Sequence, residues 1–214
     1  MHILIVILLL GLLSTDEKTN LQPVPVDDLR YQLETFISEQ DLSAADSTEV
    51  MSILHFEDFI GTDLDGNPVN FSQPEYDGYT PSEIIIFGYY AEWCPNCRQN
   101  LPAALRLYDS YKDKGLKFVL NFMYSDPDRV REYVKENNIP FPVIIGSEDR
   151  EENPEIRLET THYILRTVLD DYRRWGTPFY IIYVNDIPDT WFVVAGEFIE
   201  DEIDDFLANH LVNN

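Results

Sequence analysis

The apolar residues of this chain fall into runs of two kinds. An unbroken apolar run at 84–90, rich in β-branched residues and too short to cross a membrane, predicts a buried central strand. Similar runs predict further strands at 117–122, 142–145, 179–184 and 191–195. Between the runs, helical spacing predicts helices over 94–114, from Asp126 onward, and a closing helix with Ile199, Ile203, Phe206 and Leu207 on one face. This alternation predicts an α/β sandwich with helices on both faces of the sheet.

Turn residues divide these elements. Short alternating apolar positions at 56–71 surround Asp65-Gly66-Asn67-Pro68 and predict a hairpin ahead of the central strand. Pro102 lies inside the predicted helix after the central strand and should bend it, and Gly115 should end it. The acids near the hairpin do not match a calcium loop, because its sixth and twelfth positions are prolines.

The first fifty residues differ from the rest. Residues 1–14 carry an apolar run of signal-peptide length, which predicts either a cleaved signal peptide or a short membrane anchor, and hence export from the cytoplasm. Residues 15–52 contain a polar, proline-containing linker. There Asp27 could cap a short helix with Leu29, Leu33, Phe36 and Ile37 on one face. We therefore expect the folded domain to span 53–214.

An acidic segment interrupts the domain at about 148–172. Six acids and two arginines in residues 148–159 predict a solvated insertion. The spacing of Tyr163, Ile164, Val168 and Tyr172 predicts a helix directly after it.

The net charge changes the expected partners. With 39 acidic and 15 basic residues the formal net charge is −24, which repels nucleic acid and anionic lipid surfaces, so we expect neither as a partner. A hydrophobic content of 44% is sufficient for a packed core.

The only two cysteines of the chain, Cys94 and Cys97, follow the central strand at the start of a predicted helix. Their spacing within a first helical turn allows a disulfide to open and close with little backbone movement. Unpaired N–H groups and the helix dipole at this end favour a thiolate at Cys94. We expect Cys94 to be the nucleophile and Cys97 to resolve a mixed disulfide, with Pro95 suited to a first-turn position.

The cysteine pair has two other possible interpretations, a zinc site and a structural disulfide. A zinc site needs four ligands, and the chain adds only four scattered histidines to the two cysteines. A purely structural disulfide would close a very small loop, where the entropic gain is least. The sequence therefore favours redox chemistry, with no metal and no cofactor.

Several residues together resemble the thioredoxin superfamily. They are Trp93-Cys94-x-x-Cys97, then Leu101-Pro102, and far downstream Gly176-Thr177-Pro178 at the start of a strand. The hairpin before the sheet, and Thr rather than Ile before the proline, are similar to the TlpA-like branch of extracytoplasmic thiol–disulfide oxidoreductases. The similarity extends over about 53–210.

The resemblance implies a thioredoxin-like three-layer α/β/α sandwich with a central mixed sheet and an N-terminal hairpin extension. It implies that Pro178 is a cis-proline facing the disulfide and that the backbone of Thr177 pairs with the substrate chain. Trp93, Pro95 and Asn96 would border the bound substrate. The implied partners are protein thiols or disulfides, and a membrane or soluble redox protein that recharges the dithiol, with this chain acting as a reductant.

Two departures from the family pattern bear on mechanism. Many TlpA-like proteins carry an acid where this chain has Asn100, and thioredoxins themselves bury an Asp where it has Gly88. Both usual proton acceptors for Cys97 are thus missing, and we expect Glu92 to face solvent. A peroxiredoxin-like peroxidase would require Thr at the position of Ala91. A non-enzymatic alternative is a binding or assembly factor of the same fold, holding clients through its acidic surface and the 148–172 segment.

Overall fold

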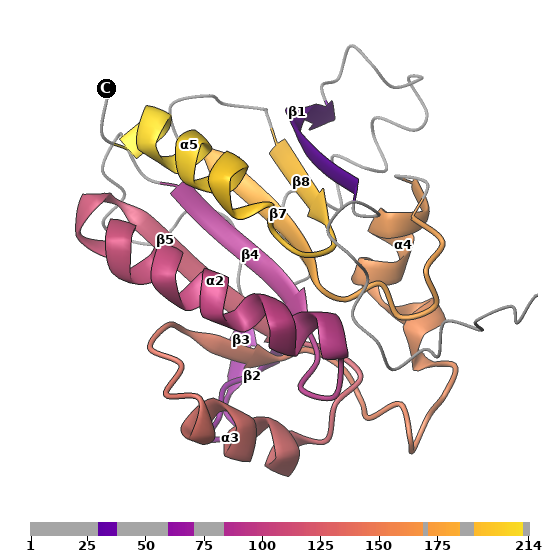
Figure 1. The fold of residues 1–214 in the computed structure, drawn as a ribbon. Coiled ribbons are helices and arrows are strands. Elements are labelled where there is room, and N and C mark those ends of the chain that lie inside the picture. Colours follow the sequence, from indigo (N-terminus) through magenta and orange to yellow (C-terminus); the bar gives the residue numbers. More distant parts are fainter. Residues whose placement is uncertain (1–29, 38–59, 71–83, 169–170, 185–190, 212–214) are drawn as a thin grey trace, which may run out of the picture.

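A computed structural model describes residues 30–37, 60–70, 84–168, 171–184 and 191–211. Within these residues, eight strands form one sheet in the order β1-β8-β7-β4-β5-β6-β2-β3 (Figure 1). The strands are β1 (Arg30–Ile37), β2 (Ile60–Thr62), β3 (Pro68–Asn70), β4 (Ile84–Tyr90), β5 (Leu116–Phe122), β6 (Val143–Ile145), β7 (Phe179–Val184) and β8 (Trp191–Ala195). The helices are α2 (Pro95–Tyr111), η2 (Lys112–Lys114), α3 (Pro127–Glu136), η3 (Ile156–Glu159), α4 (Thr161–Val168) and α5 (Glu200–Leu211).

The sheet is mixed. Strands β4, β5 and β6 are parallel, and β7 pairs antiparallel with β4, as β8 does with β7. Three strand ends therefore lie along the same side of the sheet, where the strands end or begin: the carboxyl ends of β4 and β8 and the amino end of β7. Segments from three distant parts of the sequence meet there.

Helices cover both faces of the sheet. One core contains buried side chains of α2, α3 and α5 together with Ile84 and Ile86, and Figure 1 shows α2 and α5 side by side over that face. The opposite core contains Phe87, Tyr89 and Leu165, the last from α4. Because successive strand residues point to opposite faces, β4 supplies both cores, and all seven of its residues are buried. The predicted three-layer α/β/α sandwich is confirmed.

Most predicted elements are present near their expected positions. The hairpin pairs β2 with β3 across Gly66, and Asp63 stabilises the turn by accepting hydrogen bonds from the backbone N–H groups of Asp65 and Asn67. Helix α2 continues through Pro102, and the following turn ends at Gly115, whose φ of 108° favours glycine. Asp126 caps α3, as expected.

The helix predicted across 30–37 is wrong. These residues form β1, which pairs antiparallel with β8 and occupies an edge of the sheet. A helix of this length is marginal on its own, whereas the exposed edge of β8 offers a row of backbone partners. The remainder of the 1–14 and 15–52 predictions lies outside the described residues.

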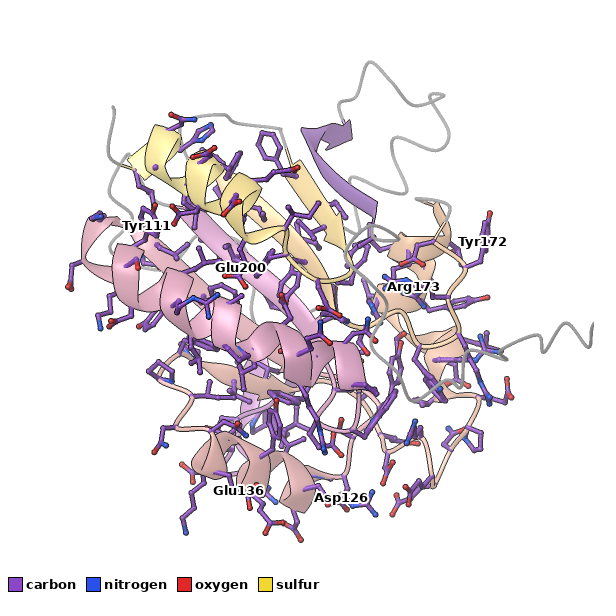
Figure 2. All side chains as sticks on the ribbon, in the orientation of Figure 1. Tyr111, Asp126, Glu136, Tyr172, Arg173 and Glu200 are labelled. Atoms are coloured by element: carbon purple, nitrogen blue, oxygen red, sulfur yellow. The ribbon has the colours of Figure 1, made fainter. Side chains whose placement is uncertain are left out.

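The segment at 148–172 is partly as predicted. Glu148, Glu151 and Glu152 are exposed, but Asp149 is buried. The helix expected next is α4, but not all of the apolar residues that predicted it are buried. Ile164 is exposed, and Tyr172, which is 73% exposed, lies beyond the helix and points away from the molecule (Figure 2).

Polar side chains make up much of the buried face of α4. His162, Leu165 and Arg166 are fully buried. Arg166 donates to the carbonyl oxygens of Asp171 and Arg173. Buried polar groups are tolerated when they are hydrogen-bonded, so a pattern of apolar residues alone missed this face.

Among the described residues, no helix combines the length and the apolar character needed to cross a bilayer.

Candidate functional site

The two cysteines lie where β4 passes into α2. Cys94 is the N-cap residue of α2, with extended φ and ψ of −76° and 121°, and Pro95 follows in the first turn. The backbone N–H of Cys97 donates to the sulfur of Cys94 at 3.5 Å. Cys94 is 5% exposed and Cys97 is completely buried. The outer sulfur is therefore the one that a substrate can reach.

The two sulfurs have opposite acidities. The pKa of Cys94 is lowered to about 6, first by the hydrogen bond from the Cys97 thiol and further by the backbone N–H groups of Cys97 and Asn96, against the opposing effect of burial. The pKa of Cys97 is raised well above its usual range, chiefly by burial and then by the neighbouring Cys94. Near neutral pH, Cys94 is a thiolate while Cys97 keeps its proton.

The loop before β7 faces the nucleophile. The peptide bond between Thr177 and Pro178 is cis, and the carbonyl oxygen of Thr177 lies 3.3 Å from the sulfur of Cys94. Both loop residues are buried. The structure thus brings together Cys94 and the Thr177-Pro178 pair, which are more than eighty residues apart in the sequence.

Trp93 borders the dithiol on one side. Its indole Nε1 donates to the carbonyl oxygen of Tyr124 at 3.0 Å, and its ring meets Trp175 edge-to-face with centroids 5.7 Å apart. The Trp93 ring is half-buried. It packs against both cores.

Asn96 leads to a residue that the sequence did not identify. Its side-chain amide donates to a carboxylate oxygen of Glu197 at 2.9 Å, and Glu197 is only 3% exposed. The pKa of Glu197 is raised to about 7, mainly by burial and also by the negative charge of Cys94, although the bond from Asn96 lowers it. A buried carboxyl with a pKa near 7 is suited to proton transfer.

Asn100 secures the segment that carries Glu197. The Asn100 side-chain oxygen accepts from the backbone N–H of Phe198 at 3.0 Å, and its amide donates to the hydroxyl of Tyr180. The residue that replaces the usual acid therefore fixes the turn that presents another acid. The only signal in the sequence was an acid two residues after the apolar run of β8, a strand whose end meets the dithiol only in the folded sheet.

The absence of an acid at Gly88 has a steric cause. A Cβ at Gly88 would lie 2.8 Å from both Leu120 and the ring of Tyr180. The Tyr180 side chain occupies the space beside this position, so an aspartate would not fit there without rearrangement.

Glu92 does not face solvent as predicted. It is 4% exposed, and burial raises the pKa of its carboxyl. The chain turns directly after β4, so the position between Ala91 and Trp93 is enclosed rather than projecting outward. Within the part of the chain that the structure describes, no group of three or more His, Cys, Asp or Glu side chains is placed to hold a metal ion.

The mixed sheet, the cysteine pair at a helix N-terminus and the facing cis-proline define a thioredoxin-like protein with a dithiol site. The model of the AhpC/TSA family matches residues 54–193, and the chain belongs to this family. The resemblance to the TlpA-like branch of the thioredoxin superfamily is confirmed.

Similar proteins carry related names. The chain is 26% identical over 87 residues to thiol-disulfide oxidoreductase ResA of Bacillus cereus (strain ZK / E33L), a match covering 41% of this chain and 47% of that protein. It is 29% identical over 65 residues to sporulation thiol-disulfide oxidoreductase A of Bacillus subtilis (strain 168), covering 29% and 39% respectively. The matched region thus spans about half the length of these relatives, or less.

Solved structures support the fold. A secreted thiol-disulfide isomerase from Corynebacterium glutamicum has a TM-score of 0.50 at 12% identity, covering 72% of this chain and 81% of that one. The MTB dsbF structure has a TM-score of 0.50 at 15% identity, covering 72% of this chain and 96% of that one. At these identities the likeness concerns the fold alone.

Proposed function

We propose that this protein is an enzyme that exchanges disulfides with extracytoplasmic protein substrates through Cys94 and Cys97, acting as a reductant. The observation that carries the proposal is the opposite acidity of two sulfurs in one helical turn, beside the Thr177-Pro178 loop. Two proteins to which the chain is similar, ResA and sporulation thiol-disulfide oxidoreductase A, carry names that agree with this reaction type.

The reaction consists of two exchanges. The Cys94 thiolate attacks one sulfur of a substrate disulfide, forming a mixed disulfide and releasing the other substrate sulfur as a thiolate that takes up a proton. Cys97 then loses its proton and attacks Cys94, which forms the Cys94–Cys97 disulfide and releases the second substrate thiol. The substrate gains two electrons and two protons. Both electrons come from the dithiol, one proton comes from Cys97, and the other comes from solvent, to which Cys94 had already lost its own proton.

Glu197 is our candidate for the proton acceptor in the second step. Cys97 is buried with a raised pKa, so its attack requires a base. Glu197 is hydrogen-bonded to Asn96, which lies between the cysteines, and the Cys94 charge contributes to its raised pKa. Water could carry the proton between Cys97 and this carboxylate.

The acidity of Cys94 supports the direction. Its pKa of about 6 lies nearer to thioredoxin, at about 7, than to the strong oxidant DsbA, at about 3.5. A membrane or soluble redox protein would then return electrons to the disulfide. Export rests on the apolar run within residues 1–14.

Trapping tests the mechanism. A Cys97→Ser variant should accumulate mixed disulfides with protein substrates, visible as reducible adducts on non-reducing gels, while Cys94→Ser should not. The same preparations should be incubated with a reduced client as the matched control. Absence of adducts in Cys97→Ser under every redox buffer tested would reject the exchange mechanism.

The two alternatives predict different results. A binding or assembly factor would hold its clients equally well after both cysteines are replaced by serine. A peroxidase would consume hydrogen peroxide with a stoichiometric loss of thiol, although Ala91 provides no hydroxyl at the position where that chemistry requires Thr.

A further inference from the structure

Four side chains on the Trp93 side of the dithiol form what we call the arginine–aromatic surface. They are Trp93, Arg150, Arg174 and Trp175, and each is exposed or half-buried. The guanidinium carbon of Arg150 lies 3.6 Å from the centroid of the Trp93 ring and 5.9 Å from that of Trp175. That of Arg174 lies 5.3 Å from the Trp175 ring. Two cations therefore stack on the aromatic pair that borders the nucleophile.

The backbone fixes Arg150 in this position. The carbonyl oxygen of Tyr124 accepts hydrogen bonds from both the Trp93 indole and the backbone N–H of Arg150, at 3.0 and 3.3 Å. The Tyr124 ring also packs against Trp175, with centroids 5.1 Å apart. Arg150 and Trp93 thus share one anchor. Arg150 keeps a fixed position relative to Cys94, the residue after Trp93.

Stacking leaves the hydrogen-bonding edge of each guanidinium available. An arginine packed on a ring uses its face, while its N–H donors remain in the plane and point outward as a fork. Among the described residues, neither Arg150 nor Arg174 forms an ion pair, whereas Arg106, Arg129 and Arg131 each pair with a carboxylate.

The charge balance gives these two arginines many possible partners. A chain with 39 acidic and only 15 basic residues has an excess of carboxylates with which to pair them. An arginine fork matches the two oxygens of a carboxylate in bidentate geometry. We propose that the arginine–aromatic surface recognises an Asp or Glu side chain next to the reactive cysteine of the substrate. This inference deepens the proposed disulfide exchange and rests on it.

Matched peptide disulfides test the preference. Each peptide carries one cysteine in a disulfide with the same chromophoric aromatic thiol, flanked by Asp, Asn or Lys. The reduced protein reacts with the peptide disulfide. The products are the free peptide thiol, the free aromatic thiol and the protein with a Cys94–Cys97 disulfide. For each peptide, the rate of its reaction with the protein is divided by the rate of its reaction with dithiothreitol. This ratio corrects for the intrinsic reactivity of each peptide disulfide. We expect the Asp peptide to react about three to ten times faster than the Asn peptide, with the Lys peptide slowest.

Two variants assign the effect to the arginines. Replacing both residues (Arg150→Gln with Arg174→Gln) should bring the Asp-to-Asn ratio close to one. Arg106→Gln changes the net charge by one unit from a position about 18 Å along α2 from Cys94, and should leave the ratio unchanged.

The outcomes separate the two proposals. An Asp-to-Asn ratio of one or less in the unmodified protein would overturn the acidic-substrate inference while leaving the exchange reaction intact. Equal loss of rate with both peptides in the double variant would also overturn it, because the arginines would then support the site without selecting the substrate. Failure to release aromatic thiol from any peptide would count against the proposed exchange reaction itself.

Discussion

At the residue scale, the chemistry depends on the different surroundings of two identical thiols. Cys94, at the helix N-terminus, receives hydrogen bonds that favour the thiolate, whereas Cys97 lies one turn further in and is fully buried. Because the strongest single influence on Cys94 is the bond from Cys97, the nucleophile depends on its partner before any substrate arrives.

The alkylation rate of Cys94 should follow its thiolate fraction. With iodoacetamide the rate should rise about tenfold per pH unit below about pH 6 and level off above it, because only the thiolate reacts. In Cys97→Ala the plateau should move to higher pH, since the main stabilising donor is lost. Cys97→Ser retains an O–H donor and is the matched control. Identical profiles for the Ala variant and the unmodified protein would contradict this account.

Replacing Glu197 should slow the resolving step. The carboxylate form acts as the base, so the rate at which Cys97 releases the substrate should rise through about pH 7. In Glu197→Gln we expect this rise to disappear, resolution to slow about tenfold or more, and mixed disulfide to accumulate. Glu200→Gln removes an exposed acid three residues away and is the control. Quenched-flow analysis of the mixed disulfide would reveal an unchanged step, which would exclude Glu197 as the base.

At the element scale, side chains of α4 and of residues 171–173 pack beside the cis-proline loop. The guanidinium of fully buried Arg166 lies against Gly176, where a Cβ would overlap it, and Gly176 has a φ of 63°. Asp171 pairs with Arg166 at 3.5 Å and with Arg173 at 2.6 Å. The part of the chain that reads as an acidic insertion therefore ends in a buried ionic cluster beside the site.

Removing Arg166 should destabilise the protein. Arg166→Met should lower the free energy of unfolding by about 3 kcal/mol, because two backbone carbonyls and Asp171 lose a buried donor. Arg129→Met, which breaks an exposed pair with Glu151, should cost at most about 1 kcal/mol. Urea unfolding of both variants measures the difference. Equal values would show that the buried cluster does not stabilise the segment.

At the scale of the whole molecule, a net charge of −24 dominates the electrostatics. Like charges over one compact surface repel one another, and this repulsion destabilises the folded state at low ionic strength. Packing between the helices and the sheet must offset this repulsion.

Added salt should stabilise the fold. Raising sodium chloride from about 0.01 M to 0.15 M shortens the screening length from about 30 to 8 Å, so the midpoint of thermal unfolding should rise. Potassium chloride should act equally, which distinguishes screening from the binding of a particular cation. A midpoint that falls or stays constant with both salts would show that charge repulsion does not limit the stability of the fold.

The sequence by itself determined the elements whose signals are local. A continuous apolar run specifies β4, and helical spacing after a cysteine and a proline specifies α2. The short spacing of Cys94 and Cys97 predicts the proposed redox chemistry. The resemblance to a known family added the facing Thr177-Pro178 loop. The helix predicted at 30–37 is wrong because these residues form backbone hydrogen bonds with β8 instead. The local sequence pattern contains no information about this distant strand.

The surroundings of the dithiol depend on how distant segments pack together. Glu197 reaches Asn96 because β8 runs in the same direction as β4 and ends at the same edge of the sheet. Arg150 reaches Trp93 because the chain returns past Tyr124. Burial, which raises the pKa of Glu197 and Cys97, is a property of the packed molecule and not of any stretch of sequence. The two reactive sulfurs could therefore be predicted from the sequence, whereas the groups that shift their pKa values could not.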